Sequence, residues 1–195
     1  MKTDIRDIHI TQCTDSPYIK PQRMTYTENG YKKAWDFVQS LDSVAIILHR
    51  IDKDALVVVR QFRPPVFLKN NDGYTHELCA GLIDKEGKSI RQIAAEEVLE
   101  ECGYEIDSKD LREVAVFHTS VGTSGAKQYL FYAQVDESHK RTEGGGVDGE
   151  VIESALLPRA ELETFLANEH IVKTPGLGFG ILWFLRHTTD KGISV

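Results

Sequence analysis

Four glutamates lie within six residues of this 195-residue chain, at positions 96, 97, 100 and 101. If residues 90–102 form a helix, the four side chains cover an arc of about 140° on one side of it. Carboxylates grouped at the edge of a buried region suit a hard divalent cation such as Mg²⁺, which takes oxygen ligands and leaves positions for water and substrate phosphates. The alternative is a solvated acidic face, the more common origin of such a charge run.

The spacing of these glutamates is unfavourable for a helix that binds no cation. The four side chains form two like-charge pairs at a separation of four residues, and each pair costs about a few tenths of a kcal/mol. No Lys or Arg lies one turn away on the same arc to offset them. In the first turn of the helix, the same side carries the apolar residues within 90–94, so we expect another part of the protein to cover this end of it. A bound metal ion would turn the repulsion into attraction.

Local signals place both ends of the helix that carries the glutamates. Ser89 stands at the expected N-cap, and Gln92 three residues later completes a capping box. Gly103 stands where a left-handed C-terminal cap is expected. The sequence therefore predicts a helix over residues 90–102.

Most of the other elements that must position this helix read as strands. The strongest, 43–48 and 55–59, are continuous apolar runs joined by a polar turn at 50–54, which is typical of strands covered on both faces. Many strands, one central helix, more strands and terminal helices indicate an α+β fold with a mixed sheet. Further strands are expected at 8–11, 24–27, 74–79, 114–118, 128–135 and 151–157, a hairpin turn at 28–30, and helices at 158–167 and 179–186.

Bulk composition narrows the class of protein. The length suits one domain with a substantial core. A net charge of −7 argues against a general nucleic-acid binder, because no basic surface is available for a phosphate backbone. Three cysteines without CxxC spacing suggest neither a disulfide framework nor a zinc site. No segment is apolar enough for a membrane helix or a signal peptide, so a reducing, cytoplasmic setting is expected.

Residues 81–88 and 96–104 carry a pattern typical of a known family. Together they resemble the Nudix box, G-x5-E-x7-R-E-U-x-E-E-x-G-U, in which U is a bulky apolar residue. The match is specific in the C-terminal half, where the three glutamates at 97, 100 and 101 are followed by Gly103 and Tyr104. The resemblance implies the Nudix α/β/α sandwich, here with an additional β subdomain at the N-terminus.

The chain departs from the box at two charged positions. One extra residue separates Gly81 from the helix, Lys88 stands where the box has its first glutamate, and Glu96 stands where it has its arginine. In the family these two positions brace the loop against the helix with opposite charges. Because both charges are reversed here, Lys88 and Glu96 can form the same brace with inverted polarity. The alternative is a relaxed loop without the ion pair.

Flanking segments indicate a branch of the family. Residues 59–65 and 77–81 resemble the Nudix enzymes that act on ADP-ribose and nucleoside-diphosphate sugars, and the likeness to UDP-sugar hydrolases extends over nearly the whole chain. Ala126 stands where ADP-ribose enzymes usually have a glutamate, which favours a UDP-sugar. The resemblance implies hydrolysis of the pyrophosphate bond of UDP-sugars such as UDP-glucose, giving UMP and a sugar 1-phosphate. The alternatives are an ADP-ribose pyrophosphatase and a Nudix-fold binding module without catalysis.

The resemblance also implies the metal site and its cation. Glu97 and Glu101 correspond to ligands of Mg²⁺, for which Mn²⁺ can substitute, and the Ala80 carbonyl and Glu100 belong to the same site. Metal ions there would neutralise the diphosphate, lower the pKa of a bound water and orient it for in-line attack. Glu97 and Glu100 are thereby also expected to take part in catalysis.

A second acidic segment follows three consecutive glycines at 144–146, which predict a mobile loop. Related enzymes bring a further metal ligand or a general base from this region. Glu150 fits the ligand role and Asp148 the role of the base, although Glu143 is also close in sequence. The alternative is a solvated acidic turn.

Three residues are expected to contact the substrate. Arg63, at the end of a strand, resembles the arginine that faces phosphate, and a guanidinium suits this role by bidentate pairing. A strand-end ion pair is the alternative for Arg63 and applies still more to Arg60. Trp35 corresponds to an aromatic that stacks on a base, or else anchors the N-terminal strands. His118 is expected to be structural.

The N-terminal region bears on assembly. Residues 1–42 form a candidate N-terminal strand region, and residues 43–195 the Nudix domain. In the resembling enzymes such a segment pairs with a second subunit, so the resemblance implies a homodimer. The expected small-molecule partner is a nucleoside diphosphate sugar, with no nucleic acid and no membrane involved.

Overall fold

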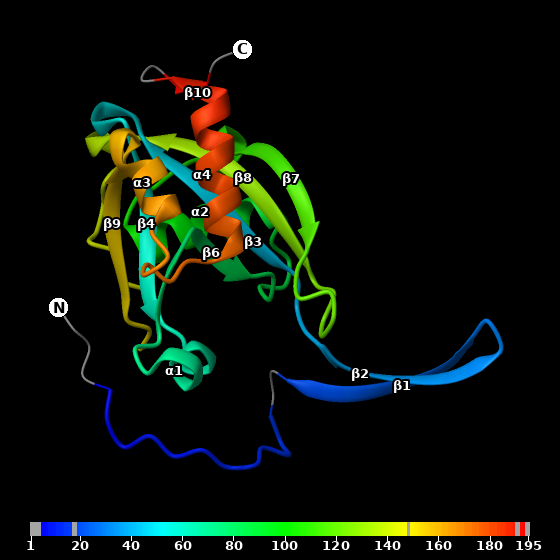
Figure 1. Cartoon of the computed structure of the whole chain (residues 1–195). Helices are drawn as coiled ribbons and strands as arrows, with labels where there is room; N and C mark the ends of the chain where they lie inside the picture. The colour runs from blue at the N-terminus through cyan, green and yellow to red at the C-terminus, as the bar shows by residue number, and fades with distance from the viewer. Residues whose placement is uncertain (1–4, 17–18, 148, 190–191, 194–195) are drawn as a thin grey trace.

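The computed structural model describes residues 5–16, 19–147, 149–189 and 192–193, and they form a mixed sheet with helices on both of its faces (Figure 1). The strands are β1 (Lys20–Glu28), β2 (Tyr31–Gln39), β3 (Ser43–Arg50), β4 (Ala55–Phe62), β5 (Tyr74–Glu77), β6 (Cys79–Leu82), β7 (Arg112–His118), β8 (Lys127–Val135), β9 (Ile152–Pro158), β10 (Thr188–Thr189) and β11 (Gly192–Ile193). The helices are α1 (Pro64–Asn70), α2 (Ile90–Cys102), α3 (Leu162–Ala167) and α4 (Pro175–His187), with short 3₁₀ turns η1 (Ile51–Lys53), η2 (Ser108–Asp110), η3 (Glu137–His139) and η4 (Arg159–Glu161).

The main sheet has seven strands with β3 at its centre. Its principal order is β5-β4-β3-β8-β7, while β6 pairs with β3 and β9 pairs with β4. β3 and β8 are parallel, and the other pairings are antiparallel. The expected mixed sheet is confirmed.

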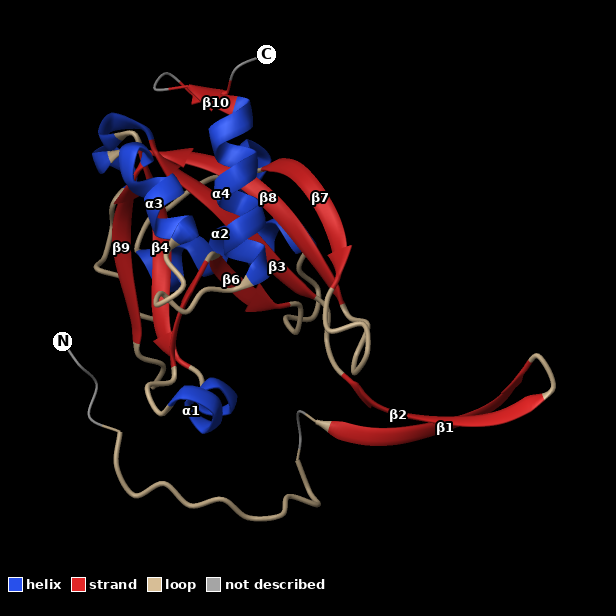
Figure 2. Ribbon diagram, in the orientation of Figure 1, coloured by secondary structure: helices blue, strands red, loops and turns tan. Residues whose placement is uncertain are grey.

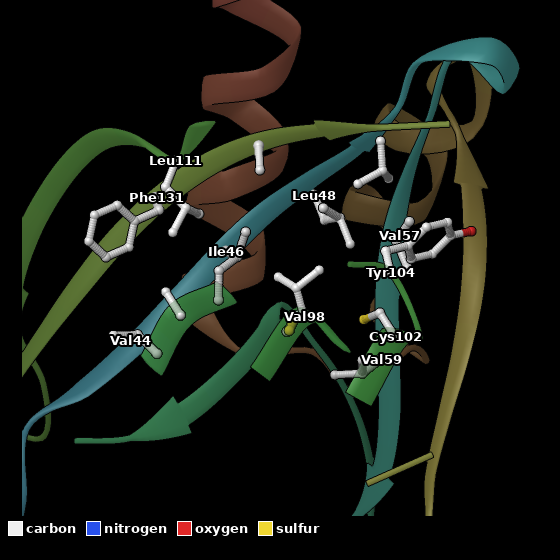
Figure 3. Packing of buried hydrophobic residues seen from close by; sticks show 14 of the residues in the cluster. Val44, Ile46, Leu48, Val57, Val59, Val98, Cys102, Tyr104, Leu111 and Phe131 are labelled. Carbon is white, nitrogen blue, oxygen red and sulfur yellow. The ribbon is translucent and has the colours of Figure 1, made fainter. Parts of the chain in front are cut away.

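Alternate residues of β3 enter two hydrophobic cores. Val44, Ile46 and Leu48 pack on the face covered by α2, and Figure 3 shows them with Val98 and Cys102 of that helix. Residues 45 and 47 point to the opposite face, which α4 covers. Both faces of β3 are therefore buried, as its continuous apolar run predicts.

Helix α2 has the predicted bounds and caps. The Ser89 side chain accepts a hydrogen bond from the Gln92 backbone N–H, and the Gln92 side chain accepts from the Ser89 backbone N–H. Gly103 follows with φ 76°, in the left-handed region that favours glycine. These contacts fix the start and end of the helix that carries the glutamates.

Other boundaries differ from those expected. Residues 8–11 are exposed and are not a strand, since no neighbouring strand pairs with them among the described residues. Helix α1 begins at Pro64, because proline needs no N–H partner in the first turn of a helix. The segment 158–167 divides into η4 and α3, and α4 begins at Pro175, four residues before the predicted start, with the Thr174 hydroxyl capping it.

Strands β1 and β2 form a separate hairpin that extends away from the main sheet (Figure 2). Its turn is Asn29-Gly30, with φ 51° and 81°, as the expected hairpin turn at 28–30 requires. The hairpin contacts the β7–β8 loop, where the Val38 N–H donates to the Thr123 carbonyl. No helix among the described residues is long and apolar enough to cross a membrane.

A buried histidine lies in β3. His49 Nδ1 is 2.9 Å from the Tyr132 hydroxyl, and its Nε2 is 3.6 Å from Asp54 Oδ1. Asp54 in turn accepts from the Arg159 guanidinium at 2.8 Å. Burial lowers the pKa of His49, and the positive charge of Arg159 acts in the same direction, against the attraction of Asp54.

Candidate active site

The glutamates of α2 face strand β6. Glu101 is 4% exposed, and its Oε2 accepts a hydrogen bond from the Ala80 N–H at 3.0 Å. The backbone of β6 also lies against Glu97, so that a Cβ added at Gly81 would be only 2.1 Å from the Glu97 Cδ. Glycine at position 81 therefore lets the Glu97 carboxylate lie directly on the strand.

Burial makes the carboxyl groups of Glu97 and Glu101 weak acids. Burial is the main cause that raises the pKa of Glu101 to about 8, although the hydrogen bond from Ala80 opposes the shift. Burial likewise raises the pKa of Glu97. The nearby Glu150 carboxylate adds to both shifts. The site thus groups carboxyl groups where water is largely excluded, a setting in which nearby positive charge is needed to favour their ionised form.

The triple-glycine loop packs against the end of α2. The N–H groups of Gly145 and Gly146 donate to the carbonyls of Glu101 and Glu100, both at 3.0 Å. All three glycines have positive φ, and a Cβ at Gly144 would lie 2.3 Å from the Glu101 carbonyl oxygen. The loop therefore satisfies helix-terminal carbonyls, and its close approach requires glycine.

The acidic segment after the glycines contributes negative charge near the site. Glu150 is exposed, yet its charge acts on Glu97, on Glu101 and on the guanidinium of Arg63. Glu143 is exposed as well. Asp148, the candidate base, lies outside the described residues.

Two lysines of the β6–α2 loop pair with the glutamates of the helix. Lys88 Nζ is 2.6 and 2.8 Å from the two carboxylate oxygens of Glu96, so the ion pair of reversed polarity forms, and its role as a brace stays a prediction. Lys85 Nζ lies among three carboxylates, 3.0 Å from Glu100, 3.2 Å from Glu96 and 3.6 Å from Glu97. Partial burial works against its charge, but the hydrogen bonds to Glu100 and Glu96 raise the pKa of Lys85.

Arg63 forms a bidentate ion pair at the rim of the site. Its Nε and Nη2 donate to the two oxygens of Glu77 at 2.8 and 3.0 Å. The Thr75 hydroxyl also donates to Glu77. Burial alone would raise the pKa of Glu77, but these hydrogen bonds lower it. Arg63 is thus fixed in place beside the acidic site with 44% of its side chain exposed.

A cavity of about 500 Å³ adjoins the carboxylates. Ala80, whose N–H donates to Glu101, and Glu77, which pairs with Arg63, both line the cavity, so the cavity lies next to the acidic site. Phe117 of β7 and Phe179 of α4 form an aromatic wall, with ring centroids 4.8 Å apart in an edge-to-face arrangement. The volume lies within the range of small-molecule sites.

Three other candidates lie away from the carboxylates or are engaged elsewhere. The Arg60 guanidinium donates to Glu153 at 3.0 Å and stacks 3.8 Å from the Tyr74 ring centroid, which is the strand-level ion pair given as its alternative. Trp35 lies on the hairpin, 53% exposed, and its Nε1 donates to the Gly122 carbonyl at 3.0 Å. His118 lines the cavity, and its Nδ1 is 2.9 Å from the Gly125 carbonyl oxygen.

Some site residues were missed from the sequence. Lys85 is four residues after Gly81 in the loop, where no helical periodicity relates its side chain to the glutamates of α2. Glu77 lies in the segment 77–81 that carries the family resemblance. Its carboxylate could have been predicted from this segment as the ion-pair partner of Arg63. The aromatic wall joins β7 to α4, more than 60 residues apart, and has no local signature.

The chemistry of the donors fits a divalent cation. Every candidate ligand is an oxygen, from the side chains of Glu97, Glu100, Glu101 and Glu150 and from the Ala80 carbonyl, which is the donor set of Mg²⁺. Across the described residues, no three acidic, histidine or cysteine side chains are gathered into a ready-made metal shell.

Comparison with known proteins agrees with this fold and site. A model of the NUDIX domain matches residues 40–175, and the chain belongs to the Nudix hydrolase family, whose members generally use divalent metal ions. The chain is 36% identical to the uridine diphosphate glucose pyrophosphatase of Bos taurus and 34% identical to that of Mus musculus, in each case over 92% of this chain and 94% of the relative. It is 33% identical to the GDP-mannose pyrophosphatase of Cronobacter sakazakii over 62% of this chain and 61% of the relative.

Proposed function

We propose that this protein hydrolyses the pyrophosphate bond of UDP-sugars such as UDP-glucose, releasing UMP and a sugar 1-phosphate. The observation that carries the proposal is the pair of carboxylates, the partly buried Glu97 and the buried Glu101, held against the backbone of β6. The relatives support it, because two are UDP-glucose pyrophosphatases and a third cleaves GDP-mannose.

The proposed cation is Mg²⁺, with Mn²⁺ as a substitute. Its ligands would be Glu97 and Glu101 with the Ala80 carbonyl, and Glu100 and Glu150 at the edge of the site. When bound, the metal supplies positive charge to the diphosphate and activates water as the nucleophile. Net negative charge in the protein is consistent with an anionic substrate if cations are bound first.

The protein's own groups bind and orient the substrate and move the proton. Arg63 is exposed enough to bind a phosphate, and Glu77 holds its guanidinium in one orientation. In-line attack on phosphorus also needs a carboxylate to accept a proton from the nucleophile. We assign this role to Glu100 or to Asp148. Arg60 would act through Tyr74 and Glu153, not by touching the substrate.

The cavity beside Ala80 is proposed to hold one end of the substrate. Its aromatic wall of Phe117 and Phe179 suits the flat face of a base or the apolar face of a sugar ring. Trp35 lies on the hairpin, so a role in base stacking would require the hairpin of a second subunit to reach the site.

Residues 1–42 are proposed as a dimerisation segment distinct from the Nudix domain at 43–195. The support is the hairpin, which forms its own sheet and leaves Met24, Tyr31 and Trp35 more than half exposed. A homodimer would cover such residues. We also propose a cytoplasmic setting, supported by three free cysteines, two of them buried.

One substrate panel tests the proposal. UDP-glucose, UDP-galactose, GDP-mannose and ADP-ribose are each offered with Mg²⁺ or Mn²⁺, and the products are identified by chromatography. UDP-sugars should give the highest kcat/KM, and Glu97→Gln should abolish turnover, while the exposed carboxylate variant Glu86→Gln should behave as wild type. A preference for ADP-ribose would favour the alternative function, an ADP-ribose pyrophosphatase. A Glu97→Gln variant with wild-type turnover would refute the assignment of the site.

A further inference from the structure

A lysine side chain lies among the carboxylates proposed as metal ligands. Lys85 Nζ is 3.0 and 3.3 Å from the two oxygens of Glu100 and 3.6 Å from Glu97 Oε1. Its third partner is Glu96, at 3.2 Å, which is not in the proposed ligand set. With 29% of its side chain exposed, Lys85 is partly withdrawn from water at this position.

The positive charge of the Lys85 ammonium group offsets the repulsion between the glutamates of α2. Glutamates four residues apart on a helix repel one another. Lys85 pairs with both members of the Glu96/Glu100 pair, and with Glu97 of the other pair. Without a bound metal ion, the helix therefore receives its compensating positive charge from the loop.

The same contacts place Lys85 in competition with a metal ion. An ammonium group and a divalent cation both seek the oxygens of Glu97 and Glu100 and repel each other at this distance. A metal ion that binds these two side chains must displace the ammonium group from them. Lys85 can then remain near the helix, since Glu96 is outside the ligand set.

Lys88 provides an internal comparison. It comes from the same loop and carries the same charge, but among the described residues its ion pair is with Glu96 alone, at 2.6 Å. Its side chain is 43% exposed. A metal ion can bind the proposed ligands without breaking this pair.

We propose that Lys85 is a tethered cation that occupies the carboxylate cluster until a divalent ion displaces it, and that it thereby weakens the affinity of the site for metal. This inference rests on the ligand assignment made in the proposed function. Removing the charge at position 85 should tighten metal binding about three- to fivefold, which is the upper part of the scale of a partly exposed ion pair. It should also destabilise the metal-free protein, because the glutamates lose their counter-ion.

The test is a Mn²⁺ titration of the full chain without substrate, in which the electron paramagnetic resonance signal of free Mn²⁺ reports the dissociation constant. Lys85→Met should bind Mn²⁺ about three- to fivefold more tightly than wild type. Lys85→Arg keeps the charge and should stay within about twofold of wild type, as should Lys88→Met. Thermal unfolding without metal verifies that each variant is folded, and Lys85→Met should unfold at a lower temperature than Lys88→Met.

The variant Glu97→Gln distinguishes a failure of the Lys85 inference from a failure of the ligand assignment. If Lys85→Met binds Mn²⁺ no more tightly than wild type while Glu97→Gln weakens binding, the inference about Lys85 is overturned and the proposed site stands. If Glu97→Gln binds Mn²⁺ as wild type does, the ligand assignment fails, and both the proposed function and this inference fail with it.

Discussion

Replacing Gly81 by alanine should inactivate the enzyme without unfolding it. A Cβ at this position would lie 2.1 Å from the Glu97 Cδ and 2.4 Å from its Oε1, whereas ordinary van der Waals contact begins at 3.4 Å. The carboxylate must therefore retreat by about 1.3 Å, and a displacement of about 1 Å in a reacting group can cost about 100-fold in rate. The clash is with the flexible end of a side chain, and Gly81 is not among the glycines with positive φ, so the fold should tolerate the change.

The measurement is kcat/KM for UDP-glucose with Mg²⁺, together with the thermal unfolding midpoint of each variant. Gly81→Ala should lose about 100-fold in kcat/KM while its midpoint stays close to that of wild type. The matched control is Gly122→Ala, because a Cβ there meets nothing within 4 Å and the backbone is not strained. A Gly81→Ala enzyme with wild-type kinetics would show that the position of the Glu97 carboxylate does not matter, which would refute the reasoning.

Three further predictions concern the loop brace, a buried histidine and the core. Lys88→Glu should lower activity by setting two negative charges against each other, and adding Glu96→Arg should restore part of it; additive losses in the double variant would contradict the brace. Folding favours the neutral form of His49, because burial lowers its pKa, so the free energy of unfolding should be full above about pH 6.5 and decline as pH falls below it. Denaturant titrations from pH 8 to pH 5 should show a smaller decline in His49→Gln, and an equal decline would exclude His49 as the cause. Ile181→Ala, at a side chain with 0% exposure between α4 and the sheet, should lower the free energy of unfolding by about 2–5 kcal/mol in denaturant titrations, and a loss below about 1 kcal/mol would contradict the packing.

The sequence predicts best those elements whose signals are local. The bounds of α2 follow from Ser89, Gln92 and Gly103, all of which act within one turn of the helix ends. The central strand β3 follows from its continuous apolar run, which both cores bury. In each case a few neighbouring residues determine the structure.

Elements that depend on distant contacts were not predicted. Strand β2 is mostly exposed and has no continuous apolar run, and it is a strand because β1 pairs with it along nine residues. Helix α1 has only seven residues and begins at Pro64-Pro65 directly after a strand, so no helical periodicity marks it in the sequence. The contact of Trp35 with Gly122 joins residues 87 apart, so no local pattern announces it.

The candidate site likewise has residues that the sequence predicts and residues whose roles depend on distant contacts. Spacing within α2 identified the four glutamates, because helix geometry fixes which side chains share a face. The reversed Lys88–Glu96 pair was predicted from the resemblance to the Nudix box. The role of Lys85 depends on the path of the loop, and the cavity depends on the packing of α4 against β7. Neither follows from residue spacing.

Hydrolysis of UDP-glucose in ¹⁸O-labelled water tests the central claim most directly. Phosphorus nuclear magnetic resonance identifies the products and shows which of them carries the label. We expect UMP and glucose 1-phosphate from the wild-type enzyme with Mg²⁺, label on only one of the two phosphates, and no product from Glu97→Gln. Formation of UDP and free glucose, or the same products at the same rate from Glu97→Gln, would contradict the assignment of this site to pyrophosphate cleavage.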